Sequence, residues 1–311
     1  MFVTSDIFDL KAIGRFRGVD WREHLLSGVE VHGTHWPDYP TGARFLLEAA
    51  KRCGLVDEMR WAGYNRPESW RTKPLSPKSF ERLIRRELSG AKEAESVLLT
   101  GIRSVAGTET GAINFGGEAG SIRARRGPTG PIPVPGPPWR FSADFVFPLD
   151  EDPAQVANDL FRLAVDILGA EYGYHFVRDE MCNPSTYCHG IVAPLDYKAL
   201  SDRDGQEISD WADFVSDGRL WSGPWPLLRD LFQVNLLSER HMTPIEGLGR
   251  LTEWVPAQPG RGRLEAIGLG RWVWTLTDAE MIAVRPLLNQ AGLLHSCHDR
   301  VYRDLPNGGL A

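Results

Sequence analysis

Apolar and polar side chains alternate along residues 29–36 with the two-residue period of a β-strand. Val29 and Val31 fall on one face of this segment, while Glu30 and His32 fall on the opposite face. The alternation predicts a half-buried strand that turns its valines toward the core.

Four segments instead carry apolar residues at the three- and four-residue spacing of helices, each between a capping residue and a glycine. These segments are 41–53, 76–89, 153–168 and 277–291. Asp152 is expected to cap the third helix, with Gln155 completing a capping box, because their spacing matches that motif.

The last of these helices has the clearest start and end. Thr277 and Glu280 form a second capping-box pattern, and Gly292 follows the last apolar residues. Pro286 is expected to kink the helix, because proline lacks the amide hydrogen that this turn would use. The residues expected to face the core are Met281, Val284, Leu287 and Leu288.

Short strands with glycine-rich turns are predicted over 96–126 and again over 139–149. Between them, residues 127–138 contain three glycines and six prolines, which excludes a helix or a central strand and favours a long exposed loop. We interpret 1–311 as a single domain, and a division into two lobes would fall near this loop. Helices mixed with consecutive strands favour an α+β fold, mainly antiparallel sheet with packed helices.

The composition is that of an ordinary globular protein with a formal net charge of −6, which does not favour general nucleic-acid binding. No apolar window is long enough to cross a membrane, and the start of the chain lacks the pattern of a signal peptide. Four cysteines are too few for a disulfide scaffold in 311 residues, so a cytoplasmic protein with reduced thiols is expected.

Two short segments gather side chains that bind zinc or act as nucleophiles. They hold His175, Cys182, Cys188 and His189, and then His295, Cys297, His298 and Asp299. Thiolate and imidazole are natural zinc ligands, but this spacing is not that of a zinc knuckle, and no second matching pair exists. We therefore expect no metal, no cofactor and no catalytic residue. The alternative is a metal- or thiol-dependent enzyme that uses the Cys182, Cys188 and His189 cluster.

Residues 201–217 hold six acidic side chains against one basic side chain, with aromatic residues among them. One interpretation is a solvated face. The other is a surface that attracts a basic partner and docks through its aromatic rings, unless Trp211 is buried and belongs to the core. The candidate partner-binding residues are Asp202, Asp204, Glu207, Asp210, Trp211, Asp213, Phe214 and Asp217.

Three regions of the chain are similar to a group of bacterial proteins. Residues 31–70 match an opening strand, helix and tryptophan-bearing segment, 112–125 match a glycine-rich strand pair, and 269–294 match a strand and closing helix. In these packing patterns the chain resembles polymorphic-toxin immunity proteins linked to type VI secretion. The resemblance is to the families that partner restriction-endonuclease-fold nuclease toxins.

This resemblance implies a protein without catalytic residues that binds a cognate toxin and occludes the toxin's active site. The partner would be a toxin protein such as a nuclease, and neither membrane nor direct nucleic-acid binding is expected. The 127–138 loop, residues 182–190 and the tail after Leu294 depart from the family pattern. A further alternative is a non-catalytic interaction module in another bacterial conflict system.

Overall fold

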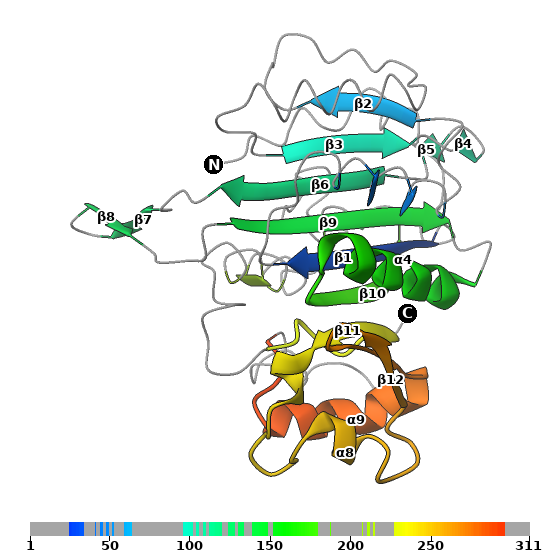
Figure 1. Cartoon of the computed structure of the whole chain (residues 1–311), viewed down its shortest axis with the longest axis vertical. Coiled ribbons are helices and arrows are strands. Elements are labelled where there is room, and N and C mark those ends of the chain that lie inside the picture. Colours follow the sequence, from blue (N-terminus) through cyan, green and yellow to red (C-terminus); the bar gives the residue numbers. More distant parts are fainter. Residues whose placement is uncertain are drawn as a thin grey trace.

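Figure 1 shows the computed structural model of the chain. The structure describes 25–33, helical positions between 41 and 52, the backbone of strands between 59 and 148, residues 152–179, Tyr187, four helical positions between 207 and 214, and residues 227–295. The predicted helix 76–89 lies outside these residues.

A nine-stranded antiparallel sheet runs through the described part of the chain (Figure 1). In spatial order its strands are β12 (Arg263–Gly268), β13 (Arg271–Thr275), β11 (Val234–Ser238), β10 (Tyr172–Asp179), β1 (Leu25–Gly33), β9 (Trp139–Pro148), β6 (Ala112–Ala119), β3 (Ser96–Gly101) and β2 (Met59–Gly63). A separate two-stranded sheet pairs β4 (Ser104–Val105) with β5 (Thr108–Glu109). The predicted α+β class with mainly antiparallel sheet is confirmed.

The segment 127–138 is not a loop throughout. Its residues Gly130–Pro133 form strand β8, which pairs with β7 (Ala124–Gly127) in a second separate hairpin. Proline cannot donate a ladder hydrogen bond, but the outer edge of a hairpin tolerates the missing donor. The composition therefore excluded a helix and a central strand, as predicted, but it did not exclude an edge strand. The single-domain interpretation stays a prediction.

Helix α4 (Pro153–Leu168) packs on one face of the sheet, against β1, β10, β11 and β13. Asp152 caps the helix as predicted, accepting hydrogen bonds from two first-turn amides at 3.1 and 3.2 Å. Gln155 does not complete the predicted capping box, because its side-chain amide donates to Asp159 instead. Gly169 ends the helix with a φ of 66°, a left-handed conformation that glycine adopts without strain.

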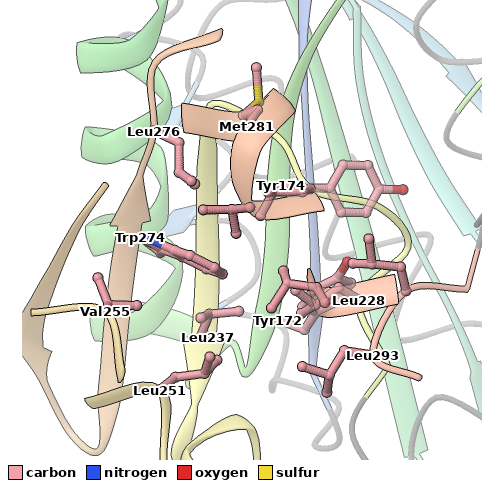
Figure 2. Packing of buried hydrophobic residues seen from close by; sticks show 14 of the residues in the cluster. Tyr172, Tyr174, Leu228, Leu237, Leu251, Val255, Trp274, Leu276, Met281 and Leu293 are labelled. Carbon is pink, nitrogen blue, oxygen red and sulfur yellow. The ribbon is translucent and has the colours of Figure 1, made fainter. Parts of the chain in front are cut away.

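The opposite face of the sheet packs against a large apolar core, shown in Figure 2. Tyr172 and Tyr174 of β10 and Trp274 of β13 meet residues from three short helical elements there. These elements are η5 (Glu239–Met242), α8 (Leu251–Trp254) and α9 (Asp278–Gln290). The sheet is thus covered on both faces at this end. None of the helices in the described ranges combines the length and apolarity of a membrane span.

Helix α9 confirms the predicted cap and most of the predicted inner face. Thr277 Oγ1 accepts from the Glu280 amide at 3.3 Å, and the Glu280 carboxylate accepts from the Thr277 amide at 2.8 Å. Three of the four predicted core residues are buried, but Leu287 is 41% exposed, so its predicted core position is wrong. Each residue turns the helix by about 100°, which carries Leu287 beyond the buried stripe that its neighbour Leu288 occupies.

Strand β1 differs from its prediction because both of its faces are buried. Val29 and Val31 are inaccessible to solvent, but Glu30 and His32 are also only 3% and 1% exposed. The half-buried prediction is therefore wrong for the polar face. Alternation indicates which side chains share a face, but it does not show whether a second layer covers that face.

Candidate functional site

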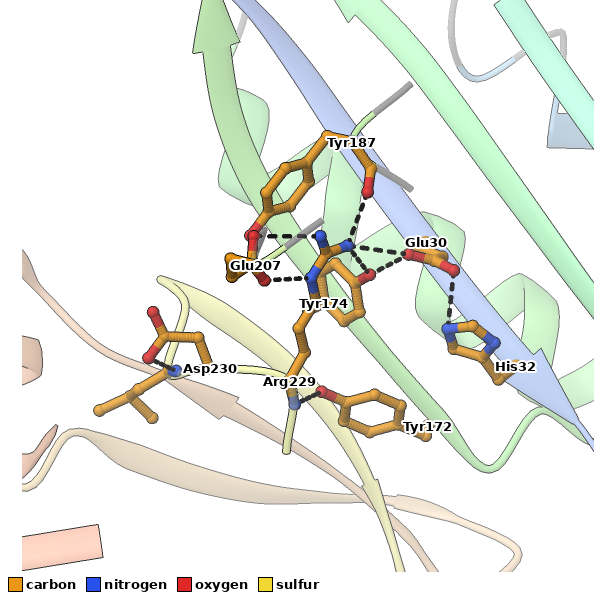
Figure 3. Close-up of polar contacts among 9 residues, drawn as sticks. Glu30, His32, Tyr172, Tyr174, Tyr187, Glu207, Arg229 and Asp230 are labelled. Carbon is orange, nitrogen blue, oxygen red and sulfur yellow. Dashed lines mark hydrogen bonds and ion pairs between the residues drawn. The ribbon is translucent and has the colours of Figure 1, made fainter. Parts of the chain in front are cut away.

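Arg229 is a fully buried arginine at the entry to β11. Its side chain is 0% exposed. Removing an unpaired guanidinium from water costs several kcal/mol or more, so neighbouring groups must neutralise it and accept its hydrogen bonds. Figure 3 shows the polar groups that converge on it.

Glu207 is the principal ionic partner of Arg229. Arg229 Nε donates to Glu207 Oε1 at 2.9 Å, and Nη2 donates to Oε2 at 3.4 Å, a two-pronged geometry that favours strong pairing. Burial alone would lower the pKa of Arg229, but Glu207 and the surrounding groups outweigh burial and raise this pKa well above its ordinary value. The guanidinium is therefore permanently charged inside the protein.

Three tyrosines satisfy the remaining donors around Arg229. Nη1 donates to the Tyr174 hydroxyl at 2.7 Å and to the Tyr187 carbonyl at 2.9 Å, and the Arg229 backbone amide donates to the Tyr172 hydroxyl at 2.7 Å. The Tyr187 ring lies 3.6 Å from the guanidinium carbon, which adds a cation–π contact. These contacts fix the guanidinium against β10 (Figure 3).

Glu30 is a second buried carboxylate, reached from Arg229 through Tyr174. The Tyr174 hydroxyl donates to Glu30 Oε2, which lies 3.7 Å from Arg229 Nη1, and Glu30 Oε1 lies 2.9 Å from His32 Nε2. Burial raises the pKa of Glu30, but His32, Arg229 and the Tyr174 hydroxyl outweigh it, so the net pKa lies below its ordinary value. Glu30 is therefore ionised at neutral pH. We call Glu30, His32, Tyr172, Tyr174, Tyr187, Glu207 and Arg229 the buried network.

Aromatic rings enclose this buried network. His32 stacks on Tyr172 with ring centroids 5.8 Å apart, and Trp211 meets His32 edge-on at 6.2 Å. Within the described residues, the Trp211 indole nitrogen has no hydrogen-bond partner, and the whole side chain is inaccessible to solvent. The charges of the network therefore interact in a low-dielectric environment. They connect β1, β10, the helical positions around Glu207 and the entry to β11.

Four of the eight candidate partner-binding residues are described, at helical positions between 207 and 214, and they differ in exposure. Glu207 points into the buried network, and Trp211 and Phe214 are 0% and 3% exposed, so both rings belong to the core. Asp210, on the same segment, is exposed. The remaining candidates lie outside the described residues: Asp202, Asp204, Asp213 and Asp217.

Two histidines of the predicted Cys/His segments are described, and they lie in different surroundings. His175 Nε2 lies 3.3 Å from Ser27 Oγ, and burial lowers the His175 pKa to about 4 although Asp152 opposes this shift. His295 packs against Phe214, with ring centroids 4.4 Å apart. The described residues contain no group of three or more His, Cys, Asp or Glu side chains suited to a metal ion. The cysteines and the other members, His189, His298 and Asp299, lie outside the described residues.

Sequence reasoning missed most of the buried network. Glu30 and His32 sit at alternating strand positions, which assigned them to solvent. The available signal was the charged pair of Arg229 and Asp230, which interrupts the apolar run 226–232. A charged residue in such a run is buried only when paired, so Arg229 predicts carboxylate partners but does not identify them.

Comparisons with known proteins find a likeness in fold alone. No protein-family model matches the chain, and no curated protein matches its sequence. The solved structure of the Pseudomonas aeruginosa type VI secretion system (T6SS) protein PA0821 is similar, with a TM-score of 0.50. The match has 12% sequence identity and covers 87% of this chain and 73% of that chain. At this identity, the likeness shows a shared fold.

Proposed function

We propose that this chain is a type VI secretion-associated immunity protein that binds a cognate bacterial toxin in the cytoplasm and occludes its active site. The observation that carries the proposal is the fold shared with a T6SS protein over 87% of this chain. The sequence regions 31–70, 112–125 and 269–294, which resemble immunity proteins of that setting, support it separately.

The buried network favours a binding protein over a catalyst. The charge of Arg229 is paired with those of Glu30 and Glu207 inside the protein. The three side chains are 0%, 4% and 11% exposed, in that order. A general acid or base must instead come within hydrogen-bond reach of a substrate. In this proposal the chain performs no turnover, and the network serves to hold a rigid binding surface.

The acidic segment 201–217 is the proposed docking surface. Its inward residues Glu207, Trp211 and Phe214 hold it against the core, while Asp210 is exposed. A nuclease toxin needs a basic cleft for nucleic acid, and an acidic surface attracts such a cleft and raises the association rate. Because the two rings are buried, charge rather than aromatic anchoring is the contribution expected from this segment.

A growth assay with the product of the adjacent gene as the proposed toxin tests the proposal. The toxin is expressed in a bacterial host with the chain, with an empty vector, or with the Arg229→Met variant, which is expected to fold poorly. Growth should recover with the wild-type chain alone, and a complex should be recovered from those cells. Continued growth arrest without a complex, when the wild-type chain is soluble and folded, would contradict the proposal.

A further inference from the structure

Leu269 lies at the turn of the β12–β13 hairpin in a backbone conformation that leucine rarely adopts. Its φ is 52°, and among the residues that the structure describes no other residue besides glycine has a positive φ. A bulky side chain is strained in this left-handed region, which glycine and asparagine adopt more readily. The turn itself therefore favours a different residue at position 269.

The side chain of Leu269 is also exposed to solvent. At 72% it is the most exposed large hydrophobic residue in the described ranges. A single exposed leucine is ordinary on a protein surface. Leu269, however, is both strained and exposed, so little burial offsets the strain, and the fold does not explain why leucine stands there. Strain of this kind is concentrated at functional sites.

The turn that carries Leu269 is uncharged and open on one side. Residues 266–270 read Ala-Ile-Gly-Leu-Gly. Gly268 and Gly270 have φ values of 99° and 65°, so three consecutive residues adopt positive φ. A Cβ added to Gly268 would find no heavy atom within 4 Å beyond its chain neighbours. Leu269 is thus the exposed large side chain of a narrow apolar turn, which we call the hairpin tip.

Hydrogen bonds hold the hairpin tip in one conformation. The Glu239 amide donates to the Gly270 carbonyl at 3.1 Å, and Arg271 Nη1 donates to the carbonyls of Leu269 and Gly270, each at 3.1 Å. Arg271 Nε also donates to the Ala170 carbonyl at 2.7 Å, just beyond the end of α4. The tip is therefore fastened to η5 and to the end of α4. A side chain held in this way loses little conformational entropy when it binds.

We propose that Leu269 is an apolar anchor that inserts into a concave apolar pocket of the cognate toxin. This inference rests on the proposed function, because occlusion of a cleft requires an element that reaches into the partner. A few desolvated anchors supply most of the affinity of a protein interface. In the acidic segment 201–217 both described rings, Trp211 and Phe214, are buried, so that segment contributes charge without an apolar anchor. Leu269 supplies the anchor that the acidic segment lacks.

Strand pairing brings the hairpin tip and the acidic segment to the same end of the sheet. Strand β13 starts at Arg271, which pairs with Ser238 at the end of β11, and β10 begins beside that same end of β11. The ring of Tyr172, the first residue of β10, lies 6.2 Å from the ring of Trp211 in the acidic segment. The charged contact and the apolar contact of the proposal therefore lie at one end of the sheet.

The shape of the hairpin tip favours a concave toxin surface over a second copy of the chain or a membrane. A twofold contact needs a patch that complements itself, and two narrow turns share too little area for such a contact. One leucine is also less than the two anchoring signals that stable membrane attachment requires. A pocket that receives the tip would instead bury the leucine on several sides.

Titration calorimetry with the product of the adjacent gene as the proposed toxin tests the anchor. Leu269→Asn removes the apolar side chain and suits the left-handed turn, so it should bind about ten-fold or more weakly and yet melt at or above the wild-type temperature. Leu269→Met keeps an apolar side chain of similar size and should bind nearly as tightly as the wild type. The matched control, Leu287→Asn, makes the same exchange at an exposed leucine of α9 and should leave the dissociation constant unchanged.

Circular dichroism melting shows whether each variant is folded, and Leu269→Gly, which also suits the turn, replaces Leu269→Asn if the latter does not fold. The inference holds if the folded tip variant loses affinity while Leu287→Asn retains it. Wild-type affinity in the folded tip variant overturns the inference and leaves the proposed function standing. Equal losses in the tip variant and in Leu287→Asn also overturn the inference. A wild-type dimer that the tip variant abolishes without a change in toxin affinity would assign the tip to a second copy. A wild-type chain that does not bind the toxin overturns both proposals.

Discussion

Arg229 and Glu207 form a two-pronged ion pair inside the protein, with Nε and Oε1 2.9 Å apart across 22 residues of sequence. This pair fastens the acidic segment to the entry of β11, and through Tyr174 it reaches Glu30 on β1. Three segments that are distant in sequence thus share one buried cation. The pair therefore links the proposed docking surface to the packing of β1, β10 and the entry to β11.

Arg229→Met should destabilise the protein strongly, because it leaves Glu30 and Glu207 buried without their cation. Breaking a buried ion pair from one side costs about 3–5 kcal/mol. Urea unfolding followed by tryptophan fluorescence measures the change. The matched control is Arg263→Met: Arg263 is 78% exposed and pairs with Glu265 at the surface. A similar loss in both variants would contradict the structural importance of the buried network.

Leu288→Ala and Leu287→Ala should differ although they remove the same atoms from adjacent positions of α9. Leu288 is 0% exposed, and truncating a buried leucine costs about 2–5 kcal/mol in lost burial and an added cavity. Leu287 is 41% exposed, so its truncation should cost less than about 1 kcal/mol. Thermal unfolding of both variants checks the rotation of α9. Equal losses would mean that Leu287 is buried too, as the sequence pattern predicts.

Mild acid should destabilise the fold through two buried histidines. Burial lowers the His175 pKa to about 4 and the His241 pKa to about 3, so both are neutral when folded. Unfolding restores the ordinary histidine pKa of 6.5. Below pH 6.5 the unfolded chain therefore binds more protons than the folded chain. Stability should be complete above pH 6.5 and fall as pH drops toward 4, by up to about 1.4 kcal/mol per pH unit for each histidine.

A substitution at His241 separates its share of this acid effect. His241 Nδ1 accepts a hydrogen bond from the Ser238 amide at 3.0 Å. His241→Asn keeps an acceptor near that position but does not titrate, so urea unfolding of this variant should show a smaller stability loss between pH 6.5 and 4. Glu30 acts at lower pH. Its pKa in the folded protein lies below the ordinary value, so its contribution to stability is lost only as pH falls below that ordinary value. An unchanged loss in the variant would rule out His241 as a cause.

Asp210→Lys and Trp211→Ala should separate docking from folding within the acidic segment. Asp210 is exposed, so its reversal should hardly change the melting temperature but should slow toxin association several-fold at low salt, since charge steers encounter. Trp211 is 0% exposed, and its truncation should cost about 3–5 kcal/mol of stability. Stopped-flow mixing at low and moderate salt measures the first effect. An association rate that does not change in Asp210→Lys at either salt would remove Asp210 from the docking surface.

Periodicity and capping chemistry predicted the elements that depend on local sequence. The Asp152 cap, the Thr277–Glu280 capping box and the strand at Val29 and Val31 each follow from residues within one or two turns or a few strand positions. Leu287 shows the limit of this reasoning for helices. Leu287 and Leu288 are adjacent apolar residues, and periodicity alone does not decide which of the two lies on the buried face.

The buried network depends on distant pairing and could not be predicted in the same way. Tyr174 meets Glu30 across 144 residues, and Glu207 meets Arg229 through a helical segment that lies between strands in the sequence. The acidic pattern at Glu207 and Asp210 suggested a surface, and it could not distinguish the inward acid from the exposed one. Arg229, which together with Asp230 interrupts an apolar run, predicts a buried counter-charge, but the strand order decides which carboxylates supply it.

Titration of the active toxin with the purified chain tests the central claim most directly. The toxin's activity on its own substrate is measured as the chain is added, and the complex is weighed by light scattering. Immunity by occlusion predicts that toxin activity falls linearly with added chain and reaches zero when every toxin molecule is bound. A catalytically dead toxin should compete for the same chain and restore activity. Full toxin activity in the presence of excess folded chain would contradict the account.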